Sequence, residues 1–255
     1  MNQGLVEPVS VSKEVTLRLL SLSFNLPLQP RDIPQWRGAW AQLAGRQNDL
    51  FHNHDGETAY HYRYPLVQYR VQGQRAALVA FNEGIEAVQR VLAAKDWVIQ
   101  WKGAPFELRL EDLQLREPQL SFVESPLKYR IRCWLPFSQK NFDKWLAAEA
   151  LLEQVALLNG ILVGQLLCFF SGMGWQVPQR LEADILSIDR VGKVEVHGTM
   201  RPTFEVTFRS NVALPAYLAL GKAVALGFGQ TSPCRNLAGR QRAKELKNGA
   251  LVLPY

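Results

Sequence analysis

The sequence predicts an α+β fold built from two successive units, each with the order strand–helix–strand–strand–helix–strand of ferredoxin-like domains. Stretches in which apolar and polar residues alternate are separated by stretches with apolar residues at helical spacing, which is typical of strands alternating with helices. Nearly the same order occurs in both halves of the chain. At 255 residues, of which 47% are hydrophobic, the chain is long enough for two small domains with packed cores.

The first unit is expected within residues 1–125. Its expected elements are a strand at 15–25, a helix at 33–46, a strand at 59–71, a turn at Gly73, a strand at 75–81, a helix at 83–94 and a short closing strand at 97–101. Pro27 and Pro30 end the first strand, and Asp32 suits the N-cap of the first helix. A further extended segment at 106–122 precedes a linker expected at Ser125–Pro126.

The strand at 59–71 has an irregular pattern. Its aromatic residues occupy even positions up to Tyr64, whereas its apolar residues occupy odd positions from Val67 onward. Because side chains alternate across a strand, the apolar face switches at Pro65, where a bulge is the expected cause. Tyr60, Tyr62 and Tyr64 are therefore expected to point away from the core, toward a ligand.

The second unit is expected within residues 126–255. Its expected elements are a strand at 127–135, a long helical region at 139–170, strands at 181–191 and 193–208 joined by a turn at Gly192, and a helix from Pro215 to about Leu220. The pattern does not show a last strand. The two halves are thus predicted to be two copies of one fold.

Composition narrows the class of protein. The three cysteines are scattered and form no C-x-x-C pair, which favours a reducing cytoplasm over a disulfide framework. The N-terminus lacks the pattern of a signal peptide. The longest apolar stretch, 155–170, is shorter than the roughly 20 residues that a membrane span needs, so a core helix is expected and no membrane partner.

Positive charge is concentrated at the C-terminal end. Residues 201–255 carry eight Lys or Arg against Glu205 and Glu245, which accounts for the net charge of +6 of the whole chain. Such a stretch attracts phosphate backbones and gives salt-dependent binding. A solvated basic tail is the alternative, and an acidic membrane surface is a weaker one because 239–247 has little apolar face.

Three of the four histidines, His52, His54 and His61, lie within ten residues of one another, followed closely by tyrosines. Histidine both takes and gives protons near neutral pH, so the cluster indicates acid–base chemistry beside a stacking surface. A polar loop with incidental histidines is one alternative. A zinc site completed by Asp55 and Glu57 is another, although the spacing does not require it.

The segment ALGKAVALGFGQ (219–230) contains three glycines that would let the backbone approach a phosphate closely. Its exposed N–H groups and Lys222 would then hold the phosphates. The order of a P-loop is absent. A helix C-cap followed by a glycine turn is the alternative interpretation.

Doubled ferredoxin-like units, a histidine after the first helix and a late glycine-rich loop resemble the RAMP superfamily. More narrowly, the chain is similar to the CRISPR-associated endoribonucleases that cut repeat RNA into guide RNAs. Ala219 stands where the loop of that family usually has its first glycine. The stretches that carry the resemblance are IPQWRGAW (33–40), LFHNH (50–54), YRYPLVQY (62–69), EGIEAV (83–88) and GKAVALGFG (221–229).

The resemblance implies a reaction without metal or cofactor, in which a 2′-OH attacks the adjacent phosphorus and leaves a 2′,3′-cyclic phosphate and a 5′-OH. His54 is the first candidate for an acid–base role and His52 the second; His61 is a weaker candidate, and His197 is expected to be structural. Tyr60 or Tyr62 would contact the phosphate or replace a histidine, and Arg46 or Lys222 would supply positive charge. The residues expected to bind RNA are Gly221, Lys222, Gly227, Gly229, Arg235, Arg240 and Arg242.

The partner implied by the resemblance is CRISPR repeat RNA, with a CRISPR effector complex as a further candidate partner. Whether the protein is a monomer or a homodimer stays open. Two rival functions also stay open: an RNA-binding RAMP subunit that holds guide RNA without cutting it, and a metal-dependent nuclease acting on DNA. A cleavage assay distinguishes the RNA-binding subunit from the endoribonuclease. The substrate, RNA or DNA, distinguishes the metal-dependent nuclease from it.

Overall fold

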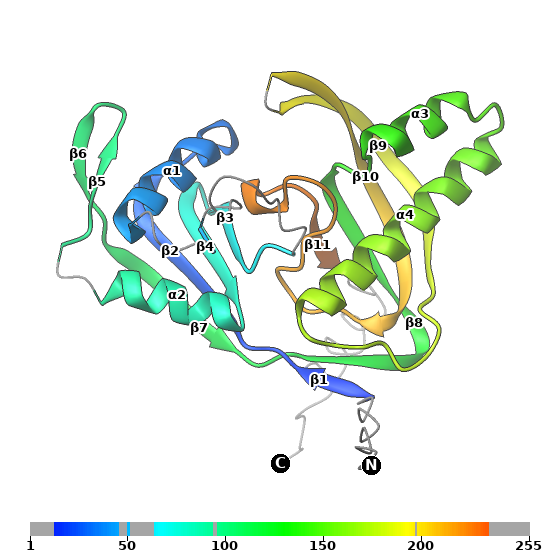
Figure 1. The fold of residues 1–255 in the computed structure, drawn as a ribbon, viewed down its shortest axis with the longest axis horizontal. Helices are drawn as coiled ribbons and strands as arrows, with labels where there is room; N and C mark the ends of the chain where they lie inside the picture. The colour runs from blue at the N-terminus through cyan, green and yellow to red at the C-terminus, as the bar shows by residue number, and fades with distance from the viewer. Residues whose placement is uncertain (1–12, 46–49, 52–63, 94–95, 197, 235–255) are drawn as a thin grey trace, which may run out of the picture.

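Two antiparallel sheets lie beside each other in the computed structural model, and the glycine-rich segment lies between them (Figure 1). The structure describes residues 13–45, 50–51, 64–93, 96–196 and 198–234. The two sheets and their helices confirm the α+β fold with two ferredoxin-like units.

The first unit contains a four-stranded sheet. Its strands, in spatial order, are β3 (Val67–Gln72), β4 (Arg75–Phe81), β2 (Leu19–Pro27) and β7 (Leu110–Arg116). Helix α1 (Ile33–Ala44), which follows the short 3-10 helix η1 (Pro30–Asp32), and helix α2 (Glu83–Leu92) provide the two crossovers. The turn predicted at Gly73 is confirmed, because Gly73 and Gln74 both adopt positive φ in the tight connection between β3 and β4.

The closing strand of this sheet was predicted wrongly. Strands β5 (Val98–Trp101) and β6 (Ala104–Glu107) pair with each other in a separate hairpin, and β7 takes the place next to β2. Lys102 and Gly103, with φ of 51° and 87°, form the two-residue turn that pairs the two short strands. The hairpin projects from the sheet at the upper left of Figure 1.

The second unit is built around one long strand, β8 (Gln119–Trp134). One edge of β8 pairs with β10 (Thr199–Ala213), which pairs in turn with β9 (Ala183–Val196). Two short strands pair separately with β8: β1 (Glu14–Thr16) near its start and β11 (Gln230–Pro233) near its end. The strand missing from the sequence pattern is therefore β11.

Three boundaries in this unit differ from prediction. Ser125 and Pro126 lie inside β8 and not in a linker, and β8 begins at Gln119. Gly192 lies inside β9, and the hairpin turns at Gly198, which adopts a φ of 72°. The long helical region is divided into α3 (Gln139–Ala147) and α4 (Leu151–Gly172).

The helix predicted from Pro215 to Leu220 does not form, because its backbone groups have partners elsewhere. The carbonyl of Leu218 accepts from the amide of Thr231, and the amide of Leu220 donates to the carbonyl of Gly229. Ala219 forms an isolated bridge with Gln230. Tyr217 adopts a left-handed φ of 65°. These pairings replace the helix by a closed loop.

Two hydrophobic clusters make up the core. Alternation along the first sheet sends Leu20, Leu78 and Ala80 to the face covered by α1 and α2, and their neighbours Val79 and Phe81 to the opposite face. That opposite face joins the cluster formed by α4 and the second sheet. The two units therefore share one core across their boundary.

Helix α4 packs one face into this shared core. By length and composition alone it would be long and apolar enough to cross a membrane. Its buried residues recur at helical spacing on one face, as expected for a helix covering a sheet. They are Leu158, Leu162, Leu166, Phe169 and Phe170.

Candidate nucleic-acid interface

The histidine segment, residues 52–63, lies outside the described residues, and so do His52, His54, Tyr60, Tyr62 and His61. The residues on either side of it are described. Phe51 is 1% exposed in the core of the first unit, and its carbonyl accepts a hydrogen bond from Nε of Arg37. Tyr64, at the other end, is 6% exposed in the shared core. Buried anchors therefore flank the candidate acid–base segment on both sides.

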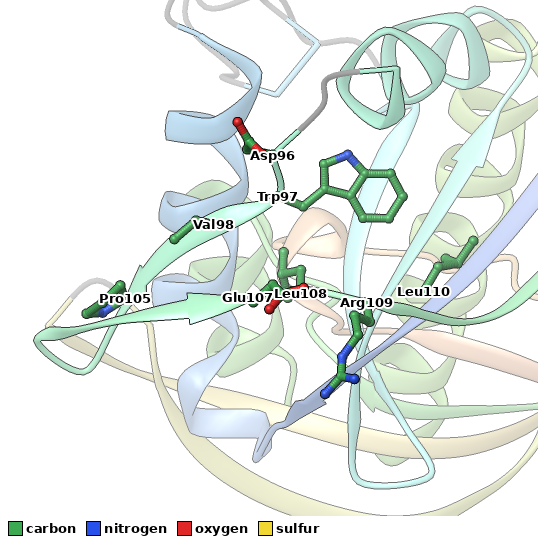
Figure 2. Close-up of a pocket in the computed structure, with 8 residues that line it drawn as sticks. All are labelled: Asp96, Trp97, Val98, Pro105, Glu107, Leu108, Arg109 and Leu110. Atoms are coloured by element: carbon green, nitrogen blue, oxygen red, sulfur yellow. The ribbon is translucent and has the colours of Figure 1, made fainter.

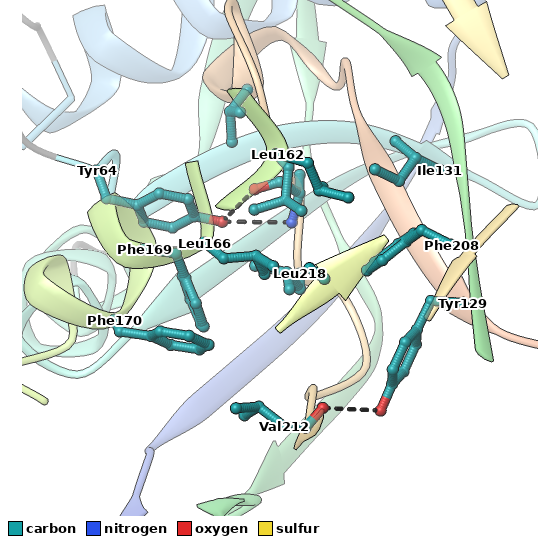
Figure 3. Packing of buried hydrophobic residues seen from close by; sticks show 14 of the residues in the cluster. Tyr64, Tyr129, Ile131, Leu162, Leu166, Phe169, Phe170, Phe208, Val212 and Leu218 are labelled. Atoms are coloured by element: carbon teal, nitrogen blue, oxygen red, sulfur yellow. Dashed lines mark hydrogen bonds between the residues drawn. The ribbon is translucent and has the colours of Figure 1, made fainter. Parts of the chain in front are cut away.

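The expectation that Tyr64 points away from the core is wrong. Its ring packs against Phe81 of the first unit and Phe169 of α4, with centroids 6.2 and 4.9 Å away. A Cβ at Gly172 of α4 would lie 2.6 Å from the Tyr64 Cβ, so this close approach requires glycine. Figure 3 shows the Tyr64 ring inserted among the side chains of the second unit.

The glycine-rich segment, residues 219–230, forms a loop closed at its base. The amide of Leu220 donates to the carbonyl of Gly229 over 2.9 Å. The loop is attached to the end of β8, since the amide of Lys222 donates to the carbonyl of Leu135 and that of Gly229 to the carbonyl of Cys133. A short 3-10 helix, η2 (Val224–Leu226), contacts α1 and β3 of the first unit. The segment thus touches both units.

Each of the three glycines predicted to bind RNA is also required by packing. All have positive φ, between 69° and 106°. An added Cβ would lie 2.7 Å from the Leu135 carbonyl oxygen at Gly221, 3.0 Å from Ile33 Cδ1 at Gly227, and 1.7 Å from the Leu220 carbonyl oxygen at Gly229. The absence of side chains lets this loop approach the protein itself closely.

Several backbone N–H groups of the segment are paired within the protein. That of Lys222 donates to Leu135, that of Gly229 to Cys133 and that of Gly227 to Val224. A phosphate-binding role for the segment would therefore draw on side chains, with Lys222 first among them, more than on these amides. The RNA-binding assignment of the segment stays a prediction.

A buried polar group joins the first sheet to this loop. The Tyr64 hydroxyl donates to the carbonyl of Ala219 over 2.9 Å and accepts from the amide of Ala219 and from Nε2 of Gln68. Arg70 donates from the same guanidinium nitrogen to Oε1 of Gln68 and to the carbonyl of Tyr217. The guanidinium groups of Arg70 and Arg116 both lie over the ring of Tyr217, 5.9 and 5.6 Å from its centroid.

Burial perturbs the titration of this group. It raises the pKa of Tyr64 to about 12, against the smaller lowering effect of the hydrogen bond from Gln68. Burial lowers the pKa of Arg70 to about 10. It also raises the pKa of Tyr69, whose hydroxyl has no hydrogen-bond partner among the described residues. Tyr64 is therefore held protonated near neutral pH and acts here as a hydrogen-bonding group.

The other basic residues predicted to contact RNA are not placed. Arg46, Arg235, Arg240 and Arg242 lie outside the described residues, and so does His197. Gly221, Lys222, Gly227 and Gly229 are placed, and they lie together in the loop between the units.

A hollow of about 620 Å³ lies elsewhere, at the base of the β5–β6 hairpin (Figure 2). Its lining mixes the acidic Asp96 and Glu107 with Arg109 and Trp97. None of the lining residues belongs to the predicted site.

Comparison with known proteins decides the family. Residues 15–119 match the Cas6b N-terminal domain, and residues 121–234 match the Cas6b C-terminal domain. The chain belongs to the Cas6b family. The two matches meet near the start of β8.

Solved structures agree with this assignment at the level of the fold. A crystal structure of Cas6b is similar with a TM-score of 0.74 at 20% identity, covering 86% of this chain and all of the other. A CRISPR RNA processing endoribonuclease Cas6b is similar with a TM-score of 0.64 at 18% identity, with the same coverage. An uncharacterized protein of Methanocaldococcus jannaschii is 28% identical over 129 residues, which is 50% of this chain and 86% of that protein.

Sequence reasoning missed the part that Gln68 and Arg70 play in this member of the Cas6b family. Both lie in β3, where polar residues alternate with Val67, Tyr69 and Val71. That alternation is typical of a strand with one face in water. Both are nevertheless buried, at 0% and 4% exposure, and they bond to Tyr64, to each other and to the carbonyl of Tyr217. A local pattern carries no signal for a partner as distant in sequence as Tyr217.

Proposed function

We propose that this Cas6b chain is an endoribonuclease that cleaves CRISPR repeat RNA to guide RNAs without a metal ion. The observation that carries the proposal is the buried bond of Tyr64, the residue that directly follows the histidine segment in the chain. Its hydroxyl donates to Ala219, the first residue of the glycine-rich segment. The residue next to the candidate acid–base segment is therefore bonded to the candidate RNA-binding segment. The endoribonuclease named among the similar structures supports the substrate class.

The proposed chemistry uses the substrate's own nucleophile. A general base removes the proton of the 2′-OH, the oxygen attacks the adjacent phosphorus in line, and a general acid protonates the leaving 5′ oxygen. The products are a 2′,3′-cyclic phosphate and a 5′-OH. Each positioned proton transfer is worth about 10²–10⁴-fold in rate. His54 and His52 are assigned to these transfers, and Arg46 or Lys222 to the charge that develops on the phosphate oxygens.

Cleavage in the presence of a chelator tests this proposal. We expect the protein to cut its own repeat RNA in EDTA and to leave cyclic phosphate ends, identified by mass spectrometry. A single 2′-deoxy substitution at the cut site is expected to block cleavage and to leave binding largely intact, since most affinity comes from phosphate contacts. Cleavage that needs added Mg²⁺ or Zn²⁺ would overturn the metal-independent mechanism. Tight binding without any cleavage would instead favour a guide-RNA-binding subunit.

Replacing Lys222 and Arg240 together by alanine is expected to weaken RNA binding. The salt dependence of binding should become shallower by roughly 0.7 in log–log slope for each phosphate of a single strand that the protein no longer neutralises. The cleavage rate at saturating RNA should change little if Arg46 supplies the charge to the phosphate oxygens, and it should fall together with the affinity if Lys222 supplies it. Titration of labelled 2′-deoxy RNA at several salt concentrations measures the affinity and its slope, and single-turnover cleavage measures the rate.

Lys140→Ala provides the matched control, because Lys140 is an exposed lysine in α3. It removes the same kind of charge from a helix that carries none of the predicted site residues. An equal change of slope in Lys140→Ala would contradict a specific role for Lys222 and Arg240.

A further inference from the structure

The buried polar group between the units has the features of a clamp. We define the inter-unit clamp as the side chains of Tyr64, Gln68 and Arg70 together with the backbone of Tyr217 and Ala219. We propose that Tyr64, Gln68 and Arg70 are positioning residues, which fix the glycine-rich segment relative to β3 of the first unit for RNA cleavage. This inference rests on the proposed function and adds residues that touch neither the RNA nor the reacting atoms.

Saturation of the Tyr64 hydroxyl is the first argument. A hydroxyl offers one donor and two acceptor positions, and all three are used here: it donates to the Ala219 carbonyl and accepts from the Ala219 amide and Gln68. Ala219 is fully buried, so its amide and carbonyl have no access to water. A phenylalanine at position 64 would leave these groups without the partner that replaces water.

The orientation of the Gln68 amide and the bond from Arg70 to Tyr217 give the second argument. Gln68 is fully buried, and its amide group is bonded on both sides, with Nε2 donating to the Tyr64 hydroxyl and Oε1 accepting from Arg70. Arg70 then donates to the carbonyl of Tyr217. The clamp thus holds the chain at two points, Tyr217, two residues before the glycine-rich segment, and Ala219, its first residue. Two points of attachment restrict rotation as well as translation of the start of the segment relative to β3.

The position of the clamp is the third argument. Tyr64 directly follows the histidine segment in the chain, and Ala219 begins the glycine-rich segment. An error of about 1 Å in the placement of reacting groups can cost about a hundredfold in rate. A clamp at this junction is therefore suited to control the rate of cleavage and not the affinity for RNA.

Tyr64→Phe tests the inference against a matched control, Tyr129→Phe. Both tyrosines belong to the same core cluster, and Figure 3 shows their hydroxyl bonds in opposite parts of it. The Tyr129 hydroxyl accepts from the amide of Leu214 over 2.9 Å, within the second unit. Both variants remove one buried hydroxyl, but only Tyr64→Phe removes a bond between the units.

We expect Tyr64→Phe to lower the single-turnover rate at saturating RNA by about tenfold or more. This loss is a part of the roughly hundredfold loss in rate that misplaced reacting groups can cause. Tyr129→Phe should keep the wild-type rate. The affinity of both variants for 2′-deoxy RNA and the shape of their pH–rate profiles should be unchanged, because Tyr64 transfers no proton. A purely structural role would lower the melting temperature of both variants and leave the rate per folded molecule intact. If Tyr64→Phe does not fold, Arg70→Lys is measured in its place, with a rate loss in the same direction.

Hydrogen exchange of single amides tests the clamp without activity. The Ala219 amide should exchange faster in Tyr64→Phe alone, and the Leu214 amide faster in Tyr129→Phe alone. In an active protein, equal cleavage rates of the two variants overturn the positioning role and leave the proposed function standing. A wild type that fails to cleave repeat RNA overturns the proposed function and the positioning role together, while the exchange pattern still shows whether the clamp exists. Unchanged exchange at Ala219 in Tyr64→Phe overturns the clamp itself.

Discussion

Replacing His54 by alanine is expected to reduce the single-turnover rate of repeat-RNA cleavage at least about a hundredfold, the low end for losing a positioned acid–base group. Affinity for the RNA should stay nearly unchanged, because one neutral imidazole contributes little to binding that phosphate contacts dominate. Rapid-quench cleavage at saturating protein gives the rate, and titration of 2′-deoxy RNA gives the affinity.

His197→Ala is the control for this experiment, since it removes an imidazole from the β9–β10 connection in the second unit. It should cleave at the wild-type rate. If His54→Ala cuts normally and His52→Ala is inactive, the roles within the pair are reversed and the site is retained. Normal cleavage by the variant that lacks both His52 and His54 would remove the acid–base site from the histidine segment.

Gly229→Ala is expected to have the largest effect on stability. The new Cβ would lie 1.7 Å from the carbonyl oxygen of Leu220, and the backbone at position 229 has a φ of 69°. The base of the glycine-rich loop must open, which breaks the hydrogen bonds of Gly229 with Leu220 and Cys133. We expect the free energy of unfolding to fall by about 2–4 kcal/mol, from overpacking and a left-handed backbone without glycine.

Thermal unfolding measures this loss, and RNA titration measures its consequence for binding. Displacement of the loop should also weaken RNA binding, because Lys222 lies in the same loop. Gly103→Ala is the matched control: Gly103 has a φ of 87° but nothing within 4 Å of an added Cβ. It should cost only about 1 kcal/mol, the backbone part of the penalty. Equal losses in the two variants would contradict the steric explanation.

Local patterns were sufficient for most elements of the first unit. Alternation and helical spacing predicted α1, β4 and α2 close to their observed bounds, because each element buries one face and its sequence shows the period of that face. Gly73 marked a turn correctly, since a tight connection between two strands requires positive φ. The family resemblance, carried by stretches along the whole chain, agrees with the Cas6b matches.

The candidate site was predicted less completely. The sequence predicts that Gly221, Lys222, Gly227 and Gly229 bind RNA, and the structure places them in one loop between the units. Their RNA-binding role stays a prediction. The acid–base assignment to His54 and His52 stays a prediction, because those residues lie outside the described part of the chain. Gln68 and Arg70 gave no signal, since a polar residue in an alternating strand has the same local pattern whether water or another segment covers it.

The α+β class, the order of most elements and the family could be predicted from the amino acids alone, because these follow from local periodicity and from motifs along the chain. Long-range packing was needed to show which strand closes the first sheet, why residues 215–220 are not a helix and where Tyr64 points. In each case the backbone or side chain has a partner distant in sequence: the Tyr64 hydroxyl binds Ala219, 155 positions away. A hydrogen bond of that kind competes with local propensity, and it forms only after the two units have packed together.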